Sequence, residues 1–236
     1  MNKQPIEKQH LTTGESLSVH GAFHTIQGEG PFCGTPAVFI RLAGCNLQCP
    51  SCDTDYTSNR FTRTPIEILE AVQLYMKEGL VVITGGEPFR QSIGPLINLL
   101  TECGYYVQVE TNGTLAPSED VAWNTLSTVR KGAYIVCSPK TGKVQSDIAK
   151  YACCYKYVIE ADSVHEVDGL PLRALRHTAH PHVARPPAWW YRPVYLQPMD
   201  SKDESANRNN LKAAINSCMA HGYILQLQVH KLIGME

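Results

Sequence analysis

The chain has 236 residues, with 21 Lys and Arg against 22 Asp and Glu, so its formal net charge is −1. This balance argues against a nucleic-acid-binding or membrane-surface protein, and no apolar run approaches the roughly 20 residues of a membrane span. The first residues lack the apolar stretch of a secretory signal. The nine cysteines do not have the spacing of a disulfide framework. We therefore expect a single domain in the reducing cytoplasm.

The first part of the chain predicts alternating strands and helices. Residues 1–17 are polar and are expected to form a loose N-terminal extension, followed by one domain over residues 18–236. A strand over 18–25 leads into a turn at 27–31, and a second strand covers 36–42. Thr64 to Glu67 form a capping box with proline at the first helical position. The helix should end at Gly79 and bury Ile68, Leu69, Val72, Tyr75 and Met76.

The same alternation continues to the end of the chain. Strands are expected at 80–84, 105–110, 133–138, 155–160, 194–197 and 224–228, with helices near 91–103, 118–129 and 204–220. The last helix should bury Leu211, Ala214, Ile215, Cys218 and Met219 and end at Gly222. Strands that alternate with helices predict an α/β fold with a parallel sheet. Cys45, Gly85, Glu110 and Ser138 all fall at or just after predicted strand ends, where such sheets bind ligands.

Three cysteines, Cys45, Cys49 and Cys52, lie within eight residues. Proteins usually hold the four irons of a [4Fe–4S] cluster through four cysteines, so three local thiols would leave one iron open to a substrate or cofactor. A structural zinc loop is the alternative, but it needs four ligands, and no second Cys or His pair with matching spacing follows. The other six cysteines are expected to be buried apolar residues.

The CxxxCxxC spacing of these cysteines resembles that of the radical S-adenosylmethionine (SAM) superfamily. The resemblance is strengthened by Gly85-Gly86-Glu87-Pro88, which follows an apolar strand. A strand that ends in two glycines lets the backbone approach a ligand closely. In the superfamily, the corresponding segment binds the amino group of the methionine moiety of SAM.

Several further segments, in order, resemble the 7-carboxy-7-deazaguanine synthase family. They are residues 25–30, the strand with Arg41, Cys52–Thr54, Thr84–Pro88, Glu110–Gly113, Ser138–Lys140, Gln197–Asp200 and His230-Lys231. The resemblance implies a partial (β/α) barrel of the radical SAM type and a homodimer. It also implies conversion of 6-carboxy-5,6,7,8-tetrahydropterin to 7-carboxy-7-deazaguanine with loss of ammonia, in the biosynthesis of queuosine precursors. Residues 164–192 depart from the family pattern and are interpreted as an insertion.

The resemblance also assigns roles to residues. Cys45, Cys49 and Cys52 would hold the cluster, and Thr54 would be a ligand of Mg²⁺, which prefers oxygen donors. SAM would contact Ser51, Cys52, Asp53, Gly86, Ser138, Pro139, Lys140, Gln197, Pro198, Met199 and Asp200, with Asn112 near its ribose. The pterin would contact Ile26, Gln27, Gly28, Thr84, His230 and the terminal carboxylate at Glu236. Arg41 would bind the substrate carboxylate, which a guanidinium pairs with bidentately.

Other interpretations remain open on the sequence alone. A glycyl-radical activating enzyme shares the cysteine and glycine motifs, and a non-catalytic metal-binding module is a third possibility. The electron donor would be flavodoxin or ferredoxin. The stretch between Asp168 and Asp200 has no acidic residue. Its basic residues, which predict either a solvated loop or a docking rim for an acidic donor, are Arg173, Arg176, His177, His180, His182, Arg185 and Arg192.

Overall fold

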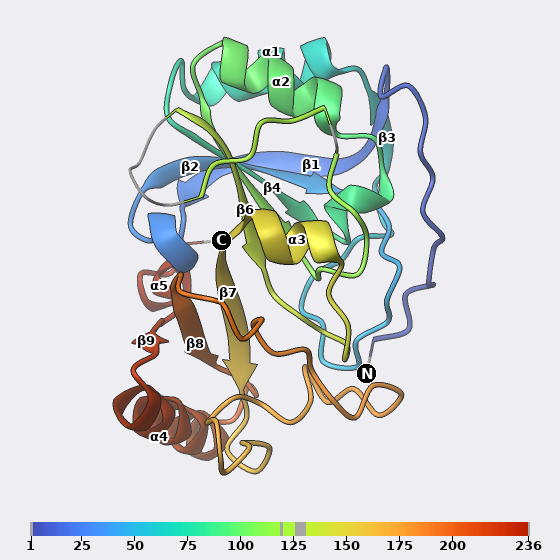
Figure 1. The fold of residues 1–236 in the computed structure, drawn as a ribbon. Helices are drawn as coiled ribbons and strands as arrows, with labels where there is room; N and C mark the ends of the chain where they lie inside the picture. Colours follow the sequence, from blue (N-terminus) through green and yellow to red (C-terminus); the bar gives the residue numbers. More distant parts are fainter. Residues whose placement is uncertain (1, 119, 126–130, 236) are drawn as a thin grey trace.

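The computed structural model describes residues 2–118, 120–125 and 131–235 (Figure 1). The strands are β1 (Leu17–Ile26), β2 (Pro36–Leu42), β3 (Phe61–Arg63), β4 (Leu80–Gly85), β5 (Tyr106–Thr111), β6 (Gly132–Cys137), β7 (Ala152–Ile159), β8 (Val194–Pro198) and β9 (Ile224–Leu225). The helices are α1 (Pro65–Tyr75), α2 (Gly94–Glu102), α3 (Ser146–Tyr151), α4 (Glu204–His221) and α5 (Val229–Leu232), with 3-10 turns η1 (Gly30–Phe32) and η2 (Pro88–Arg90).

Within the described residues, all strands belong to one nine-stranded sheet in the order β3-β1-β2-β4-β5-β6-β7-β8-β9. Neighbours from β2 to β9 are parallel, as predicted, but β1 pairs antiparallel with β2 and with β3. The short turn over residues 27–35 explains this difference, because a parallel partner needs a longer crossover. The edge strands β3 and β9 do not meet, so the sheet is an open, partial barrel (Figure 1).

The two faces of the sheet have different cores, because successive side chains of a strand point to opposite faces. On the outer face, Val81, Val107 and Ile135 belong to a large apolar cluster that also contains side chains of α1, α2, α3 and α4. On the inner face, a smaller cluster forms around Phe32 and Tyr134. The helices therefore cover the outside of the barrel, and its inner face is left for other contacts.

The N-terminal end of α1 has the predicted capping box. The Thr64 hydroxyl accepts from the Glu67 amide at 3.3 Å, and the Glu67 carboxylate accepts from the Thr64 amide at 2.7 Å. Ile68 and Val72 are buried as expected, but Tyr75 is 50% exposed. The helix ends at Tyr75 and not at Gly79. Tyr75 is therefore its last residue and is less covered than the residues of the preceding turns.

Helix α4 buries Ala214 and Cys218 as predicted, but its buried face is rotated away from the other predicted residues. Its buried residues are Asn210, Ala214, Ser217 and Cys218, whereas Ile215 and Met219 are exposed. Asn210 explains the rotation, because its amide nitrogen donates to the Met199 carbonyl at 2.8 Å and its amide oxygen accepts from the Ala161 amide at 2.9 Å. A polar side chain that caps two backbone groups turns this face towards the sheet.

Three further expectations differ from the structure. Residues 118 and 120–125 are not helical, since Trp123 forms a bridge with Ala133, and the rest of that predicted helix includes residues outside the described ranges. The last strand covers only Ile224–Leu225, and the short elements β3, α3 and α5 were not predicted. Among the cysteines expected to be buried, Cys103 is exposed and Cys33 is half-buried.

The connection between β7 and β8 contains residues 164–192, which have no helix or extended strand. Leu170, Ala174 and Val183 nevertheless join the outer core. The Trp190 ring packs edge-on against Tyr155, with ring centroids 4.5 Å apart. This segment therefore covers the outer face of β7 in the place that a crossover helix would take. No helix in the described part of the chain is both long enough and apolar enough to cross a membrane.

Candidate active site

The three cysteines of the sequence motif lie on the loop that follows β2, residues 43–57, here called the cluster loop. Cys45 and Cys49 are buried and Cys52 is half-buried. Burial, with smaller contributions from Glu87 and the two other thiols, raises the pKa of Cys45 to about 12. Burial also raises the pKa values of Cys49 and Cys52, although the Lys140 ammonium opposes this. Because the thiolate is the form that binds metal, a cationic metal centre would have to lower these three pKa values when it binds.

Gly86 brings the end of β4 against the cluster loop. A Cβ atom at Gly86 would lie 1.9 Å from the Gly44 carbonyl oxygen and 3.0 Å from the Cys45 nitrogen. The Glu87 amide donates to the Gly44 carbonyl at 3.1 Å. Gly85 has φ +116°, and its Cβ would lie 2.3 Å from the Leu42 carbonyl oxygen. The two glycines are therefore required for the backbone approach that the sequence predicts.

Glu87 joins the glycine segment to the end of β5. Its carboxylate is completely buried and accepts hydrogen bonds from the Thr111 hydroxyl at 2.7 Å, the Asn112 amide at 2.8 Å and the Phe89 amide at 3.1 Å. Burial raises the pKa of Glu87 to about 7, although these donors lower it. The Asn112 side chain then donates to Asn46 of the cluster loop at 2.9 Å. The ends of β4 and β5 and the cluster loop thus form one hydrogen-bonded unit.

The two other predicted SAM segments also lie at strand ends. Lys140, after β6, donates to the Ser138 carbonyl at 2.9 Å and to its hydroxyl, and burial lowers the pKa of its ammonium. Asp200, after β8, pairs with Lys231 at 3.1 Å. The same ammonium lies 3.9 Å from Asp53 of the cluster loop. Lys231 therefore joins the end of β8 to the cluster loop. Pro139, Gln197 and Met199 are buried, and Pro198 is half-buried.

The inner face of the barrel carries a layer of polar side chains. Because neighbouring positions in each strand belong to the outer core, alternation places these residues on the inner face. They are Arg41 on β2, Thr84 on β4, Gln108 and Glu110 on β5, Lys156 on β7 and Gln197 on β8. Arg41 and Thr84 are direct partners in the register of β2 and β4, and the Arg41 guanidinium carbon lies 4.7 Å from the Phe23 ring centroid.

Lys156 lies at the centre of this layer, a role that the sequence analysis missed. Its ammonium contacts the Glu29 carboxylate and lies 3.3 Å from that of Glu110, and its side chain is only 7% exposed. Burial alone would raise the pKa of Glu29, but Lys156 and Gln228 lower it to about 2. The two carboxylates outweigh burial and raise the pKa of Lys156. The sequence does carry a signal for this role, because Lys156 is a charged residue within the otherwise apolar strand β7. Such a residue indicates a buried, paired charge.

The turn after β1 reaches the same network. Gln27 donates to Glu110 at 3.2 Å, and Gln228 donates to Glu29 at 2.8 Å. Gly28 is in close contact with His230, because a Cβ at Gly28 would lie 1.9 Å from the His230 Nδ1 atom. Ile26 ends β1 beside this turn. The predicted substrate residues Ile26, Gln27, Gly28 and His230 are thus brought together, whereas Glu236 lies outside the described residues.

Thr54 is half-buried on the cluster loop, and its hydroxyl lies 3.5 Å from the Asp53 carboxylate. Within the described ranges, no three His, Cys, Asp or Glu side chains are grouped as they would be around a single metal ion. A cubane cluster spaces its thiolates more widely than one ion does. A Mg²⁺ ion at Thr54 would take its other ligands from water and substrate.

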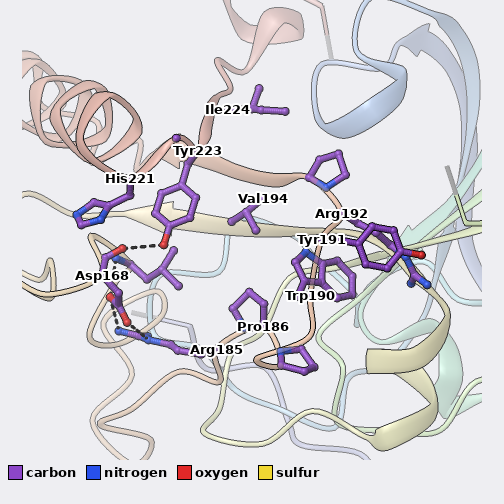
Figure 2. A pocket seen from close by; sticks show the side chains of 14 residues that line it. Asp168, Arg185, Pro186, Trp190, Tyr191, Arg192, Val194, His221, Tyr223 and Ile224 are labelled. Carbon is purple, nitrogen blue, oxygen red and sulfur yellow. Dashed lines mark hydrogen bonds and ion pairs between the residues drawn. The ribbon is translucent and has the colours of Figure 1, made fainter. Parts of the chain in front are cut away.

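A cavity of about 600 Å³ lies elsewhere (Figure 2). It opens where β8 and β9 begin, whereas the predicted site residues follow the strand ends. Asp168 and Arg185 in its lining pair with each other at 2.8 Å, and Arg192 donates to the Lys150 and Ala152 carbonyls. None of the predicted site residues lines it. We therefore locate the candidate site at the inner face and the cluster loop.

The chain is similar to known proteins over most of its length. Residues 39–132 match the Radical SAM superfamily. The chain is 40% identical over 228 residues to 7-carboxy-7-deazaguanine synthase from Rhodospirillum rubrum, covering 93% of each chain. It is 37% identical over 235 residues to the protein of the same name from Rickettsia prowazekii, covering 94% of this chain and 90% of that one. The chain belongs to the 7-carboxy-7-deazaguanine synthase family.

Membership makes the chain a radical SAM enzyme that uses a [4Fe–4S] cluster and SAM, and it replaces the alternatives of an activating enzyme or a non-catalytic metal module. The crystal structure of QueE from Escherichia coli has the same fold, with a TM-score of 0.64, 24% identity and coverage of 90% of this chain and 94% of that one. The predicted partial barrel is thereby confirmed.

The residues at this site fit both the [4Fe–4S] cluster and SAM. Three adjacent thiols are available to three irons, and Gly86 leaves the backbone beside Cys45 free of a side chain. Gln197, on the inner face, has a buried amide oxygen without a hydrogen-bond partner among the described residues. Such an acceptor is costly unless a ligand donates to it.

We expect Lys156→Met to lower the free energy of unfolding by about 3–5 kcal/mol at neutral pH, since it leaves two buried carboxylates without a cation. The folded-state pKa of Glu29, about 2, lies below the ordinary 4.5. Its stabilising contribution is therefore present above about pH 4.5 and is lost as the pH falls towards 2. The difference in unfolding free energy between the parent and the variant should therefore shrink as the pH falls from about 4.5 towards 2. Urea unfolding of the metal-free protein measures this, with exposed Lys212→Met as the control; equal losses at both lysines would contradict the account.

Proposed function

We propose that the chain converts 6-carboxy-5,6,7,8-tetrahydropterin to 7-carboxy-7-deazaguanine with release of ammonia, a step in queuosine precursor biosynthesis. The product is the one named for its relatives. The observation that carries the proposal is the polar inner face beneath the cluster loop, with one guanidinium at its edge and a net anionic network at its centre. A carboxylated pterin has the complementary groups, namely an anionic carboxylate and several N–H donors.

In this proposal Cys45, Cys49 and Cys52 would hold the cluster and leave one of its irons open for SAM. When bound, the reduced cluster and SAM supply the radical chemistry of the superfamily. The backbone of Ser51–Asp53, Gly86, Ser138–Lys140 and Gln197–Asp200 would line SAM. The hydrogen bonds that join the ends of β4 and β5 to the cluster loop support this arrangement, because they keep its lining from moving relative to the cysteines.

The substrate residues would act on different parts of the pterin. Arg41 would pair with the carboxylate, and Thr84, its partner across the β2–β4 register, would lie beside it. Two carboxylates and one ammonium leave one net negative charge at Glu29, Lys156 and Glu110, which favours the N–H groups of the pyrimidine ring. Gln27, Gly28 and His230 would cover this end of the ring. Thr54 would bind Mg²⁺, which orients substrate oxygens.

We also propose that the enzyme is a cytoplasmic homodimer, as the family resemblance implies. All nine cysteines are unpaired in the structure, which suits a reducing compartment. Sedimentation analysis of the purified protein tests the dimer, and a monomer at micromolar concentration would contradict it. Localisation of the tagged chain by cell fractionation tests the compartment, and recovery from a membrane or secreted fraction would contradict a cytoplasmic enzyme.

A flavodoxin or ferredoxin would deliver the electron, and the turn over residues 173–176 is the proposed contact. Its Leu175 carbonyl accepts from the Ser51 amide at 3.2 Å, so the turn lies against the cluster loop. Arg173 and Arg176 are exposed, although Arg176 also pairs with Glu160 at 2.6 Å. Two of the basic residues predicted for the docking rim are left out of this proposed contact. Arg185 is bound to Asp168, and Arg192 donates to backbone carbonyls.

Turnover tests the reaction. Under anaerobic conditions with dithionite, SAM, Mg²⁺ and the tetrahydropterin, the reconstituted enzyme should release the deazapurine and ammonia in equal amounts. 5′-Deoxyadenosine should not accumulate stoichiometrically, because SAM is expected to be regenerated. Chromatography measures the deazapurine and 5′-deoxyadenosine, and an ammonia assay measures the ammonia. Stoichiometric consumption of SAM would overturn the proposal.

Two substitutions test the pocket. Arg41→Ala should weaken substrate binding by roughly 2–5 kcal/mol, because a buried carboxylate would lose its charged partner. Thr54→Ala should abolish the response to Mg²⁺ and leave SAM cleavage intact. Calorimetry and magnesium titration measure these effects, with Arg208→Ala on the exposed face of α4 as the control. If both variants match the parent, the pocket has been misplaced.

The combined variant Arg173→Glu, Arg176→Gln should slow flavodoxin-driven turnover at low salt. The difference should fade at high salt, because exposed charges act on association and are screened. Dithionite-driven turnover needs no docking and should not change. The charge-reversing substitution Arg208→Glu, at another exposed arginine, provides the control. Equal losses with both reductants, or no loss with flavodoxin, would rule out this docking surface.

A further inference from the structure

The residues that precede β1 are bound to the cluster loop. Within residues 2–8, here called the N-terminal strap, the Asn2 amide donates to the Pro50 carbonyl at 3.0 Å and the Glu7 amide donates to the Cys45 carbonyl at 2.8 Å. The Asn2 side chain donates to the Cys49 carbonyl at 3.2 Å. Two of these three carbonyls belong to predicted cluster ligands. The expectation of a loose extension is therefore wrong.

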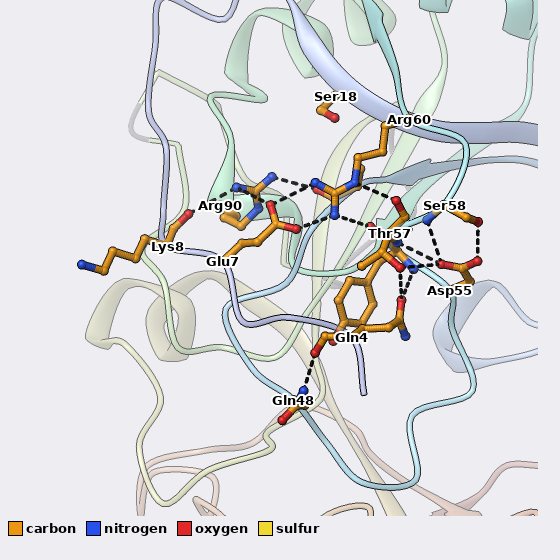
Figure 3. Close-up of polar contacts among 12 residues, drawn as sticks. Gln4, Glu7, Lys8, Ser18, Gln48, Asp55, Thr57, Ser58, Arg60 and Arg90 are labelled. Atoms are coloured by element: carbon orange, nitrogen blue, oxygen red, sulfur yellow. Dashed lines mark hydrogen bonds and ion pairs between the residues drawn. The ribbon is translucent and has the colours of Figure 1, made fainter. Parts of the chain in front are cut away.

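Gln4 makes the central contacts of the strap (Figure 3). Its amide nitrogen donates to the Thr54 carbonyl at 2.8 Å, and its amide oxygen accepts from the Tyr56 amide at 2.7 Å and from the Thr57 hydroxyl at 3.2 Å. Its own carbonyl accepts from the Gln48 side chain. Gln4 thus joins the part of the cluster loop between Cys45 and Cys49 to the part that follows Cys52.

The other end of the strap is held by charge. Glu7 pairs with Arg60, which lies just after the cluster loop, and lies 3.5 Å from Arg90 of η2. The hydrogen bond from Arg60 lowers the pKa of Glu7. Arg90 also donates to the Ala43 carbonyl at 3.0 Å and to the Lys8 carbonyl at 3.2 Å. These contacts fix the strap relative to both the beginning of the cluster loop and the segment that follows Gly86.

The cluster loop needs such support, because no helix or strand lies within residues 43–57. Fixing a residue of an irregular loop costs about 1–2 kcal/mol of conformational entropy. A metal site is tight only when its ligands are held before the metal binds. Gln4 bonds to both sides of the thiol-bearing segment, through its backbone carbonyl at Gln48 and through its side chain at residues 54–57. The side-chain bonds, which a substitution removes, lower that cost without contacting the cluster.

We propose that the N-terminal strap positions the cluster loop, and that Gln4 is its positioning residue: it holds the loop in the conformation that retains iron. The inference concerns the cluster that the family implies and does not depend on the identity of the substrate. It assigns a role to a segment whose sequence is polar and without regular structure.

The test compares Gln4→Ala with Gln9→Ala in the full-length chain. Gln9 is a matched control, because its side chain also donates to a backbone carbonyl, that of Phe89 at 2.9 Å, but not to one of the cluster loop. Both proteins are reconstituted anaerobically, and transfer of iron to a coloured chelator is followed by absorbance. Loss of three side-chain hydrogen bonds at Gln4 should accelerate iron release by roughly tenfold or more relative to the parent, whereas Gln9→Ala should release iron at the parental rate.

Urea unfolding of the two metal-free variants separates positioning from general stability. The proposal expects similar unfolding midpoints and different rates of iron release, and failure of Gln4→Ala to take up iron while its midpoint is unchanged would also support it. Gln4→Met, which keeps the volume but not the hydrogen bonds, should behave like Gln4→Ala. Equal iron release from the Gln4 and Gln9 variants, or rates that simply follow the unfolding midpoints, would overturn the proposal.

Discussion

The ion cluster of Lys156, Glu29 and Glu110 is the interaction on which the inner face of the barrel depends. A buried ammonium costs several kcal/mol unless charged partners surround it, and here they come from β5 and from the turn after β1. The same carboxylates accept hydrogen bonds from Gln27 and Gln228. One buried charge therefore fixes the central strands, the turn after β1 and the segment that leads into α5. A polar pocket can exist in the barrel because this network is satisfied.

The cluster loop has a different source of order. It has no regular secondary structure, and it is held instead by backbone contacts from two directions. The Gly44 carbonyl accepts from the Glu87 amide on one side, and the Cys45 carbonyl accepts from the Glu7 amide on the other. Lys231 adds an electrostatic link from the last part of the chain to Asp53. Residues far apart in sequence thus converge on the three cysteines.

Sequence patterns predicted the features that arise from local rules. The capping box at Thr64 sets the start of α1, and apolar runs set the parallel strands within a few residues. The spacing of Cys45, Cys49 and Cys52, with Gly86 after a strand, predicted the radical SAM family, which the relatives confirm. Contacts between distant residues were not predictable in this way. Lys156 and Glu29 are 127 positions apart, and polar residues 2–8 carry no periodic signal. The buried face of α4 also differs from the predicted one, because the Asn210 side chain is hydrogen-bonded to the Met199 carbonyl and the Ala161 amide.

The central claim is that substrate binds at the polar inner face beneath the cluster loop. A crystal structure of the anaerobically reconstituted enzyme with SAM and the tetrahydropterin tests it most directly. The account predicts pterin density between Arg41 and the Lys156 network, with SAM between the cluster and the strand ends at Gly86 and Ser138. Pterin density in the cavity lined by Asp168, Arg185 and Trp190, with the inner face filled by water, would contradict it.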